Sequence, residues 1–174
     1  MADERPLATA PTNIRAMYRR MASAESLPVF YDATPLMSEH AMPSLEASGL
    51  SEGLAAFLTE LNTKLDSILS LLTTDQLTDD FPLTAQVMEI SGQGALFVSP
   101  EKISPGDSLE MVFVLSRMPL RLAGGVVQVT DVDTFDGSPR YRGRFTNIRQ
   151  RDQEALVQFV FHEQRQQIRS AKWD

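Results

Sequence analysis

The side chains best suited to binding chemistry lie in the C-terminal half of the chain. Arg140, Arg142 and Arg144 recur at every second position, so they would share one face of a strand. A guanidinium presents a planar fork of donors that suits anionic oxygen groups such as carboxylate and phosphate. The spacing indicates basic contacts to an anionic ligand. A solvated strand face balanced by nearby acids also explains the spacing, and it is the interpretation favoured on these residues alone.

A tight turn is the second candidate, in the run Glu89-Ile90-Ser91-Gly92-Gln93-Gly94. Glycine permits a positive φ or a close backbone approach, and a serine hydroxyl can satisfy a free backbone group. The run is not a nucleophile elbow, because no glycine stands two residues before Ser91 and no helix follows. It also lacks the third glycine and the βαβ context of a dinucleotide-binding loop. The turn is therefore a candidate for binding rather than catalysis.

Catalytic and metal chemistry find little support in the composition. The 174 residues include no cysteine and two histidines, which excludes disulfides, thiolate zinc sites and cysteine nucleophiles. His40 stands in a proline-containing segment and His162 follows the largely apolar stretch 157–161. Neither has the clustered carboxylates that a metal site requires. We expect no enzymatic activity, catalytic residue, metal or cofactor.

The elements that must position these residues follow from apolar alternation and turn signals. Short strands are predicted at 83–91, 95–98, 109–115, 119–132 and 140–148, with glycine-containing turns between several of them. Gly124 and Gly125 predict a bulge or sharp bend inside the fourth strand. A helix is predicted from residue 150 to about 169, because Leu156, Phe159 and Val160 follow helical spacing. The fold class is therefore α+β, a small antiparallel barrel with a C-terminal helix.

A leucine-rich stretch at 51–73 predicts a long helix ahead of the barrel. Apolar residues alternate at steps of four and three, and a period of 3.5 over three heptads is typical of a coiled coil. Apolar side chains at the flanking e and g positions widen the stripe, which suits trimers or tetramers better than dimers. Self-association of the helix is favoured, and packing of the helix on its own domain remains the alternative. The seam consists of Leu54, Leu58, Leu61, Leu65, Ile68 and Leu72.

The remaining chain is divided by composition. Residues 1–49 are predicted to contain a tail, a short helix from Thr12 to about Ser23 with Ile14, Met17 and Tyr18 on one face, and a proline-containing connector. Residues 50–74 form the oligomerisation helix, 74–80 a polar linker, and 78–170 the barrel with its helix. The net charge of −7 argues against a nucleic-acid polymer or an anionic membrane as the main partner. No stretch approaches the roughly 20 apolar residues that span a bilayer, so a cytoplasmic protein is expected.

The order of these elements resembles a PilZ domain over roughly residues 78–170. The family signature is Asp or Asn, any residue, Ser, two residues of any kind, then Gly; Ser91 and Gly94 match it, and Glu89 stands where Asp or Asn is usual. Gly143-Arg144-Phe145 and Gln164-Arg165 also resemble the family's C-terminal half. The leucine helix ahead of the barrel resembles the atypical, tetrameric PilZ subgroup, in which a parallel four-helix bundle gathers the barrels.

The resemblance implies a bacterial receptor for cyclic di-GMP that contacts its ligand through Glu89, Ser91 and Gly94. Usual binders also carry Arg-x-x-x-Arg in the segment entering the first strand. Here 73–84 contains three aspartates and no Arg or Lys, while Arg15 and Arg19 have the spacing but lie far upstream. Two hypotheses follow. One is an atypical receptor that binds nucleotide through other basic residues or between subunits. The other is an adaptor that no longer binds nucleotide and acts through an unknown protein partner.

Overall fold

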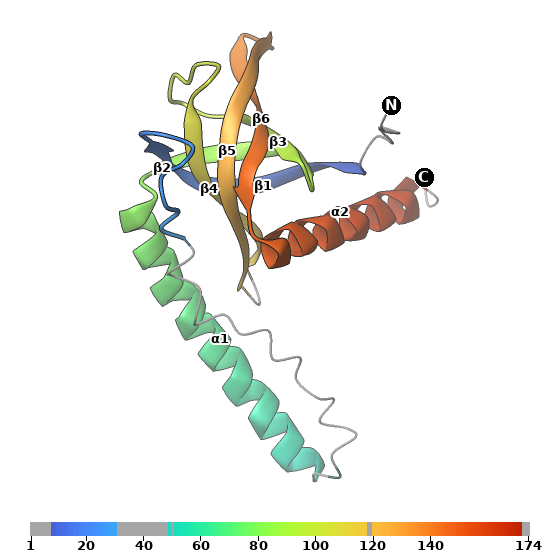
Figure 1. Ribbon diagram of the computed structural model, residues 1–174. Helices are drawn as coiled ribbons and strands as arrows, with labels where there is room; N and C mark the ends of the chain where they lie inside the picture. Colours follow the sequence, from blue (N-terminus) through green and yellow to red (C-terminus); the bar gives the residue numbers. More distant parts are fainter. Residues whose placement is uncertain (1–7, 31–48, 50, 118–119, 172–174) are drawn as a thin grey trace.

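The computed structural model describes residues 8–30, 49, 51–117 and 120–171. Within them, six strands form a closed antiparallel barrel, one helix covers an end of it, and a second helix extends away from it (Figure 1). In chain order the elements are β1 (Thr9–Met21), α1 (Glu52–Asp80), β2 (Leu83–Ser91), β3 (Gly94–Val98), β4 (Ser108–Arg117), β5 (Leu120–Phe135), β6 (Ser138–Ile148) and α2 (Gln150–Ala171).

The strand order around the barrel is β1-β2-β3-β6-β5-β4. Strand β1 closes the barrel by pairing with β2 on one side and with β4 on the other. The predicted α+β fold, a small antiparallel barrel followed by a helix and preceded by a long helix, is confirmed. Every strand predicted between residues 83 and 148 overlaps an observed strand.

The helix predicted from Thr12 to about Ser23 is wrong, because these residues lie largely in β1. Ala16 and Tyr18 point into the barrel core, whereas Met17 packs on the outer surface of the sheet. Both faces of this part of the strand are therefore buried. A strand buried on both faces does not alternate between apolar and polar residues, and its apolar steps then resemble those of a helix.

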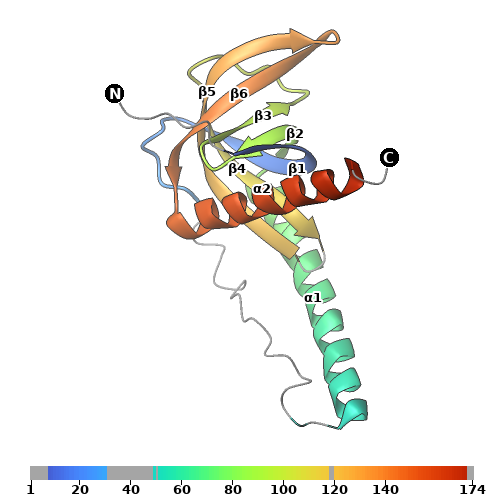
Figure 2. The same ribbon diagram turned by 90° about the vertical axis from the view of Figure 1, so that its right-hand side faces the viewer.

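The barrel core is filled by aromatic and aliphatic side chains, and α2 closes one end of it (Figure 2). Leu156 and Val160 of α2 are fully buried in the same core. Two glutamines further along α2, Gln164 and Gln167, donate hydrogen bonds to the carbonyl oxygens of Thr9 and Pro11 at 3.0 and 3.2 Å. Helix α2 thereby holds the N-terminal end of β1 as well as covering the core.

Helix α1 is longer than the leucine pattern predicts. It begins after Ser51, whose hydroxyl accepts a hydrogen bond from the backbone N–H of Leu54, and continues to Asp80. The polar linker predicted at 74–80 is therefore helical. Thr73 and Leu77 are its buried residues, which indicates that the last turns are stabilised by packing on the barrel rather than by local propensity.

A small apolar cluster on the outer surface joins α1 to the barrel; we call it the junction cluster. Its buried members are Met17, Phe30, Leu77, Phe81 and Val112. Beneath it, Glu110 is fully buried and accepts hydrogen bonds from Arg19 Nε at 2.6 Å and from the backbone N–H of Phe30 at 2.7 Å. The carboxylate thus fixes the chain at Phe30 over the outer face of β1 and β4.

Gly124 serves this cluster rather than a bulge. Residues 123–127 pair with β4 in continuous register, and the β5 irregularities toward β6 lie at Val126/Val127 and Val129/Asp131. The predicted bulge therefore lies not at the glycine pair but just beyond it, between Val126 and Val127, and the alternative of a sharp bend stays a prediction. A Cβ at Gly124 would collide with the ring of Phe30, so glycine is required there for a close approach.

Candidate functional site

The turn between β2 and β3 is held by its own hydrogen bonds. The Ser91 hydroxyl donates to the Gly94 carbonyl oxygen at 3.3 Å and accepts from the backbone N–H of Gln93 at 3.2 Å. The Gln93 carbonyl oxygen accepts from the backbone N–H of Phe145 at 2.8 Å. Gln153 of α2 donates to the Gly92 carbonyl oxygen at 3.0 Å. The serine thus has a structural role that needs no ligand.

Gly94 of this turn is required for close backbone approach, and Gly92 packs tightly against a side chain of α2. Neither Gly92 nor Gly94 has a positive φ. A Cβ at Gly94 would collide with the carbonyl oxygen of Gly143 on β6, and one at Gly92 would lie 3.0 Å from Val157 Cγ2 on α2. Of the two explanations that the sequence allows, backbone proximity applies and left-handed geometry does not.

The three arginines of β6 lie on the outer face, since Tyr141 between them is buried in the core. Glu89 pairs with Leu96, Leu96 with Arg142, and Arg142 with Asp131, so the turn and the arginines belong to adjoining rows of the sheet. Arg144 pairs with Gly94 itself. The structure therefore brings the predicted ligand residues and the predicted basic contacts onto one surface.

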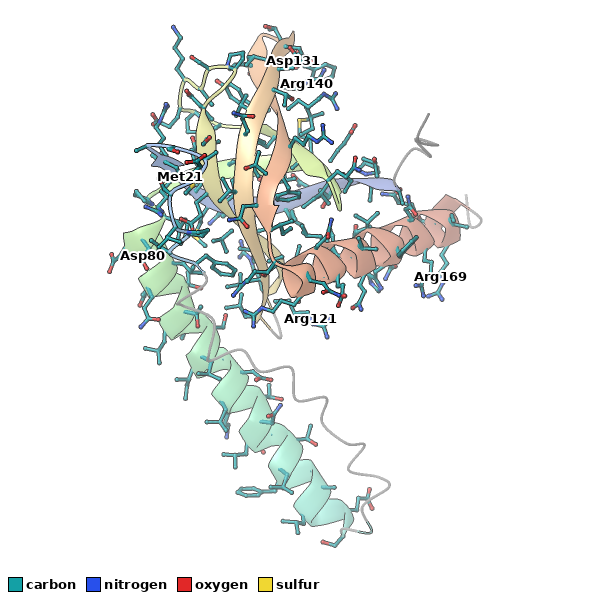
Figure 3. The ribbon with its side chains drawn as sticks, viewed as in Figure 1. Met21, Asp80, Arg121, Asp131, Arg140 and Arg169 are labelled. Atoms are coloured by element: carbon teal, nitrogen blue, oxygen red, sulfur yellow. The ribbon has the colours of Figure 1, made fainter. Side chains whose placement is uncertain are left out.

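The arginines differ in their surroundings. Arg140 forms two hydrogen bonds with the Asp133 carboxylate, at 2.8 and 2.7 Å, and its guanidinium lies 4.7 Å from the centre of the Phe135 ring. Figure 3 shows Arg140 and Asp131 on the β5–β6 ribbon. Arg142 and Arg144 are exposed, and neither forms an ion pair with another described residue. Arg140 is thus held by a partner, and the other two remain available to a ligand.

The Arg140–Asp133 pair gives a pH-dependent prediction. The hydrogen bond from Arg140 lowers the pKa of the Asp133 carboxyl, with smaller contributions from the charges of Arg140 and Arg142. Because the folded-state pKa is lowered, the pair stabilises the fold above the unfolded-state pKa, and this contribution is lost as pH falls through the folded-state value. Arg140→Gln should raise the pKa of Asp133 toward its ordinary value, as measured by carboxylate ¹³C NMR.

Arg142→Gln is the matched control, because Arg142 acts on Asp133 through charge alone. It should raise the pKa of Asp133 by less than Arg140→Gln does. An equal effect of the two substitutions would contradict the assignment of the shift to the hydrogen bond.

The arginine pair with Arg-x-x-x-Arg spacing does not form a shared clamp. Arg15 and Arg19 lie on strand β1, not on a helix as predicted. Arg19 is bonded to the buried Glu110, whereas Arg15 pairs in register with Gln86 on β2. The first barrel strand precedes α1, so 73–84 is not the segment that enters it. The aspartates at 75, 79 and 80 instead lie in the last turns of α1.

Five of the six predicted seam residues of α1 are exposed in the single chain, and Leu58 is half-buried. Its leucines at 61 and 65 are 44% and 49% exposed, and Leu72 reaches 58%. Phe57 and Leu71, at the flanking positions, are also exposed. The open alternative, packing of this stripe on its own barrel, is therefore wrong for residues 54–72. A contiguous exposed apolar surface of this kind usually marks an interaction site.

Several sequence expectations have simple outcomes. His40 lies outside the described residues, and His162 is exposed and contacts Gln166 on α2. In the described part of the chain, no group of His, Asp and Glu side chains could hold a metal ion. None of the described helices is long and apolar enough to cross a membrane.

Two features of the structure are not predicted from the sequence. One is the buried Glu110, for which the only signal is a lone acid in the apolar run 109–115. The other is a groove lined by Arg15 and Arg117.

These features define a small antiparallel β-barrel with an exposed helix that extends from it. The chain belongs to the PilZ domain family, whose pattern matches residues 63–162. This match begins within α1 and therefore excludes β1. A comparison with curated protein sequences finds no significant match.

Solved structures with TM-scores above 0.5 share this fold. One is a tetrameric PilZ domain from Xanthomonas campestris, described as self-assembled through an unusual helical bundle, with a TM-score of 0.58 and 22% identity over 97% of this chain and 92% of that chain. Another is the inhibitor of motility MotI/DgrA from Bacillus subtilis, with a TM-score of 0.52 and 12% identity. The similarity to MotI/DgrA covers 93% of the present chain, and the present chain spans about half (51%) of the MotI/DgrA chain. The PilZ domain of YcgR from Escherichia coli with cyclic di-GMP gives a TM-score of 0.44 and 16% identity over 52% of this chain and 78% of that chain.

Proposed function

We propose that the protein is a non-catalytic regulatory module of bacterial cyclic di-GMP signalling, with its barrels gathered into a homotetramer by α1. The observation that carries the proposal is the apolar stripe of α1, which extends from the barrel and whose described residues between Leu54 and Leu72 belong to neither apolar cluster of the barrel. The fold similarity to a PilZ domain that assembles through a helical bundle supports this proposal.

Tetramerisation would supply the regulatory mechanism. Four barrels on one bundle hold four copies of the same binding face close together, so that a weak contact by each barrel becomes a strong contact by the assembly. The junction cluster packs Leu77 and Phe81 against Met17 and Val112. A bundle would therefore orient the barrels as well as gather them, because the last turns of α1 are fixed to the sheet.

Two versions of the function make different use of the outer face. In the first, cyclic di-GMP binds at Glu89, Ser91 and Gly94 with the exposed guanidiniums of Arg142 and Arg144, which lie in neighbouring rows. In the second, the protein is an adaptor that has lost nucleotide binding and acts through protein contacts. The second is supported by the turn itself, since the Ser91 hydroxyl is bonded within the turn and Asp133 holds Arg140.

Calorimetric titration with cyclic di-GMP distinguishes the two versions. The receptor version predicts saturable heat and an increase in thermal stability that grows with ligand concentration. It also predicts that Arg142→Gln together with Arg144→Gln weakens binding at least tenfold, because each guanidinium would be a charge-assisted contact worth more than about 1 kcal/mol. The absence of heat and of stabilisation at saturating nucleotide would exclude the receptor version and leave the adaptor.

A further inference from the structure

The pairing between strands β1 and β4 ends before either strand does, and the two strands separate there. The last paired residues there are Ala16 and Phe113. Just beyond, β1 has a register shift between Pro11 and Ile14, and β4 has one between Val114 and Ser116. Bulges bend a strand and redirect its side chains, and they occur often beside functional sites. The diverging strands enclose a groove of about 310 Å³, lined in part by Asn13, Arg15, Gln86, Ser116 and Arg117.

Two guanidiniums from separate strands face this groove. Arg15 comes from β1 and Arg117 from β4, and neither forms an ion pair with another described residue. None of the described residues that line the groove carries a carboxylate. In a chain with 23 acidic and 16 basic side chains, such an acid-free basic groove favours an anionic ligand.

The amide groups of the groove are held in a fixed orientation. Gln86 Nε2 donates to the Ile14 carbonyl oxygen at 3.0 Å and to Asn13 Oδ1 at 2.7 Å. The backbone acceptor fixes the orientation of the Gln86 amide, which in turn fixes that of Asn13. The Asn13 amino group therefore points away from Gln86 and remains a hydrogen-bond donor beside the two arginines.

A second cavity adjoins the groove and shares Arg15 and Gln86 with it. Its volume is about 690 Å³, within the range of small-molecule sites. Arg15 is its charged lining residue among those described, and the remainder includes Thr84, Val98, Ser99 and Pro139. A ligand with its charge between Arg15 and Arg117 could extend an uncharged polar body along this surface.

We propose that the groove binds the phosphate group of a small phosphate ester, whose uncharged polar body lies in the adjoining cavity. Phosphate suits two forked donors on opposite walls, because its oxygens can accept from both guanidiniums at once, whereas a carboxylate is satisfied by one fork. A nucleic-acid polymer is disfavoured by the net charge of −7. The site differs from the PilZ turn, since Gln86 and Ser91 lie five residues apart on β2, about 16 Å along a strand.

The test is a titration of the intact protein with pyrophosphate at constant ionic strength, followed by calorimetry and by the arginine side-chain N–H signals in NMR. Saturable binding should shift the signals of Arg15 and Arg117. Arg15→Gln together with Arg117→Gln should weaken pyrophosphate binding at least tenfold. Arg121→Gln is the matched control, because Arg121 is exposed and pairs with Ser116 without lining the groove; it should retain the affinity within about twofold, since a surface charge near the site contributes little.

Each other outcome counts against the proposal. No saturable binding, or equal losses of affinity in the double variant and in the Arg121 control, would show that any attraction is diffuse.

AMP should bind more tightly than inorganic phosphate, and adenosine should not bind. Equal affinities for AMP and phosphate would show that the adjoining cavity does not contribute to binding. Displacement of pyrophosphate by cyclic di-GMP would show that the groove binds the signalling nucleotide, which would contradict the proposal of a separate site. Monomeric variants of α1 should still bind pyrophosphate, which keeps this test independent of the tetramer.

Discussion

Leu61→Asp together with Leu65→Asp should convert the protein into a soluble monomer whose barrel stays folded. The two positions are adjacent members of the seam and are 44% and 49% exposed in the single chain, so the substitutions remove no contact with the barrel. In a helical bundle they would place carboxylates in a desolvated interface, at a cost of several kcal/mol for each unpaired charge. Light scattering should report one chain, with an unchanged near-ultraviolet circular dichroism spectrum.

The control adds the same charge to the other side of α1. Thr59→Asp together with Thr63→Asp changes two exposed positions outside the seam, whose hydroxyls bond only to carbonyl oxygens of the same helix. This variant should keep the mass of the unmodified protein. A tetramer that survives the leucine substitutions would refute the seam, and a monomeric control would mean that charge repulsion alone separates the chains.

Arg19→Ala should produce a large loss of stability, because it leaves the carboxylate of Glu110 buried without its cation. Glu110 is fully buried, and Arg19 Nε lies 2.6 Å from its carboxylate. Removal of one partner of a buried pair typically costs about 3 kcal/mol or more. The loss should appear in urea unfolding at fixed protein concentration, since any association also contributes to apparent stability.

Arg20→Ala is the matched comparison on the next residue. Arg20 lies 3.3 Å from Asp107, with both side chains substantially exposed at 46% and 35%. Exposed pairs of this kind contribute at most about 1 kcal/mol. Equal losses from the two substitutions would show that Glu110 does not need its arginine, and that the junction is held by apolar packing alone.

The sequence predicted the strands between residues 83 and 148 because alternation and turn residues agree there. Gly137, for example, has a positive φ in the β5–β6 turn, which is a local requirement readable from residue type. Strand β1 lacks such agreement. Met17 on its outer face packs with Phe30 and Leu77, and these contacts depend on distant segments that periodicity does not register.

The end of α1 was mispredicted for a related reason. The heptad pattern stops at Leu72, and the residues that follow are mostly polar. Leu77 nevertheless continues the helix onto the sheet, where it is buried beside Phe81. A single apolar residue per turn is enough when the barrel supplies the partner, but the sequence does not indicate that partner.

The candidate ligand turn was predictable and the phosphate groove was not. Ser91 and Gly94 are three residues apart, so their proximity follows from local structure. Arg15 and Arg117 are about a hundred residues apart in the sequence, and they line one groove only because β1 closes the barrel against β4 and both strands have register shifts there. Such a site depends on strand β1, for which the sequence pattern predicts a helix.

The position of β1 ahead of α1 has a consequence for how this chain can be divided. The helix leaves the barrel after one strand is in place and returns to continue with the next, so it is an insertion within the domain rather than an appendage to it. A fragment limited to residues 63–162, the region that matches the family, would lack β1, the strand that pairs with both β2 and β4. Two open strand edges would then be left to pair with other molecules.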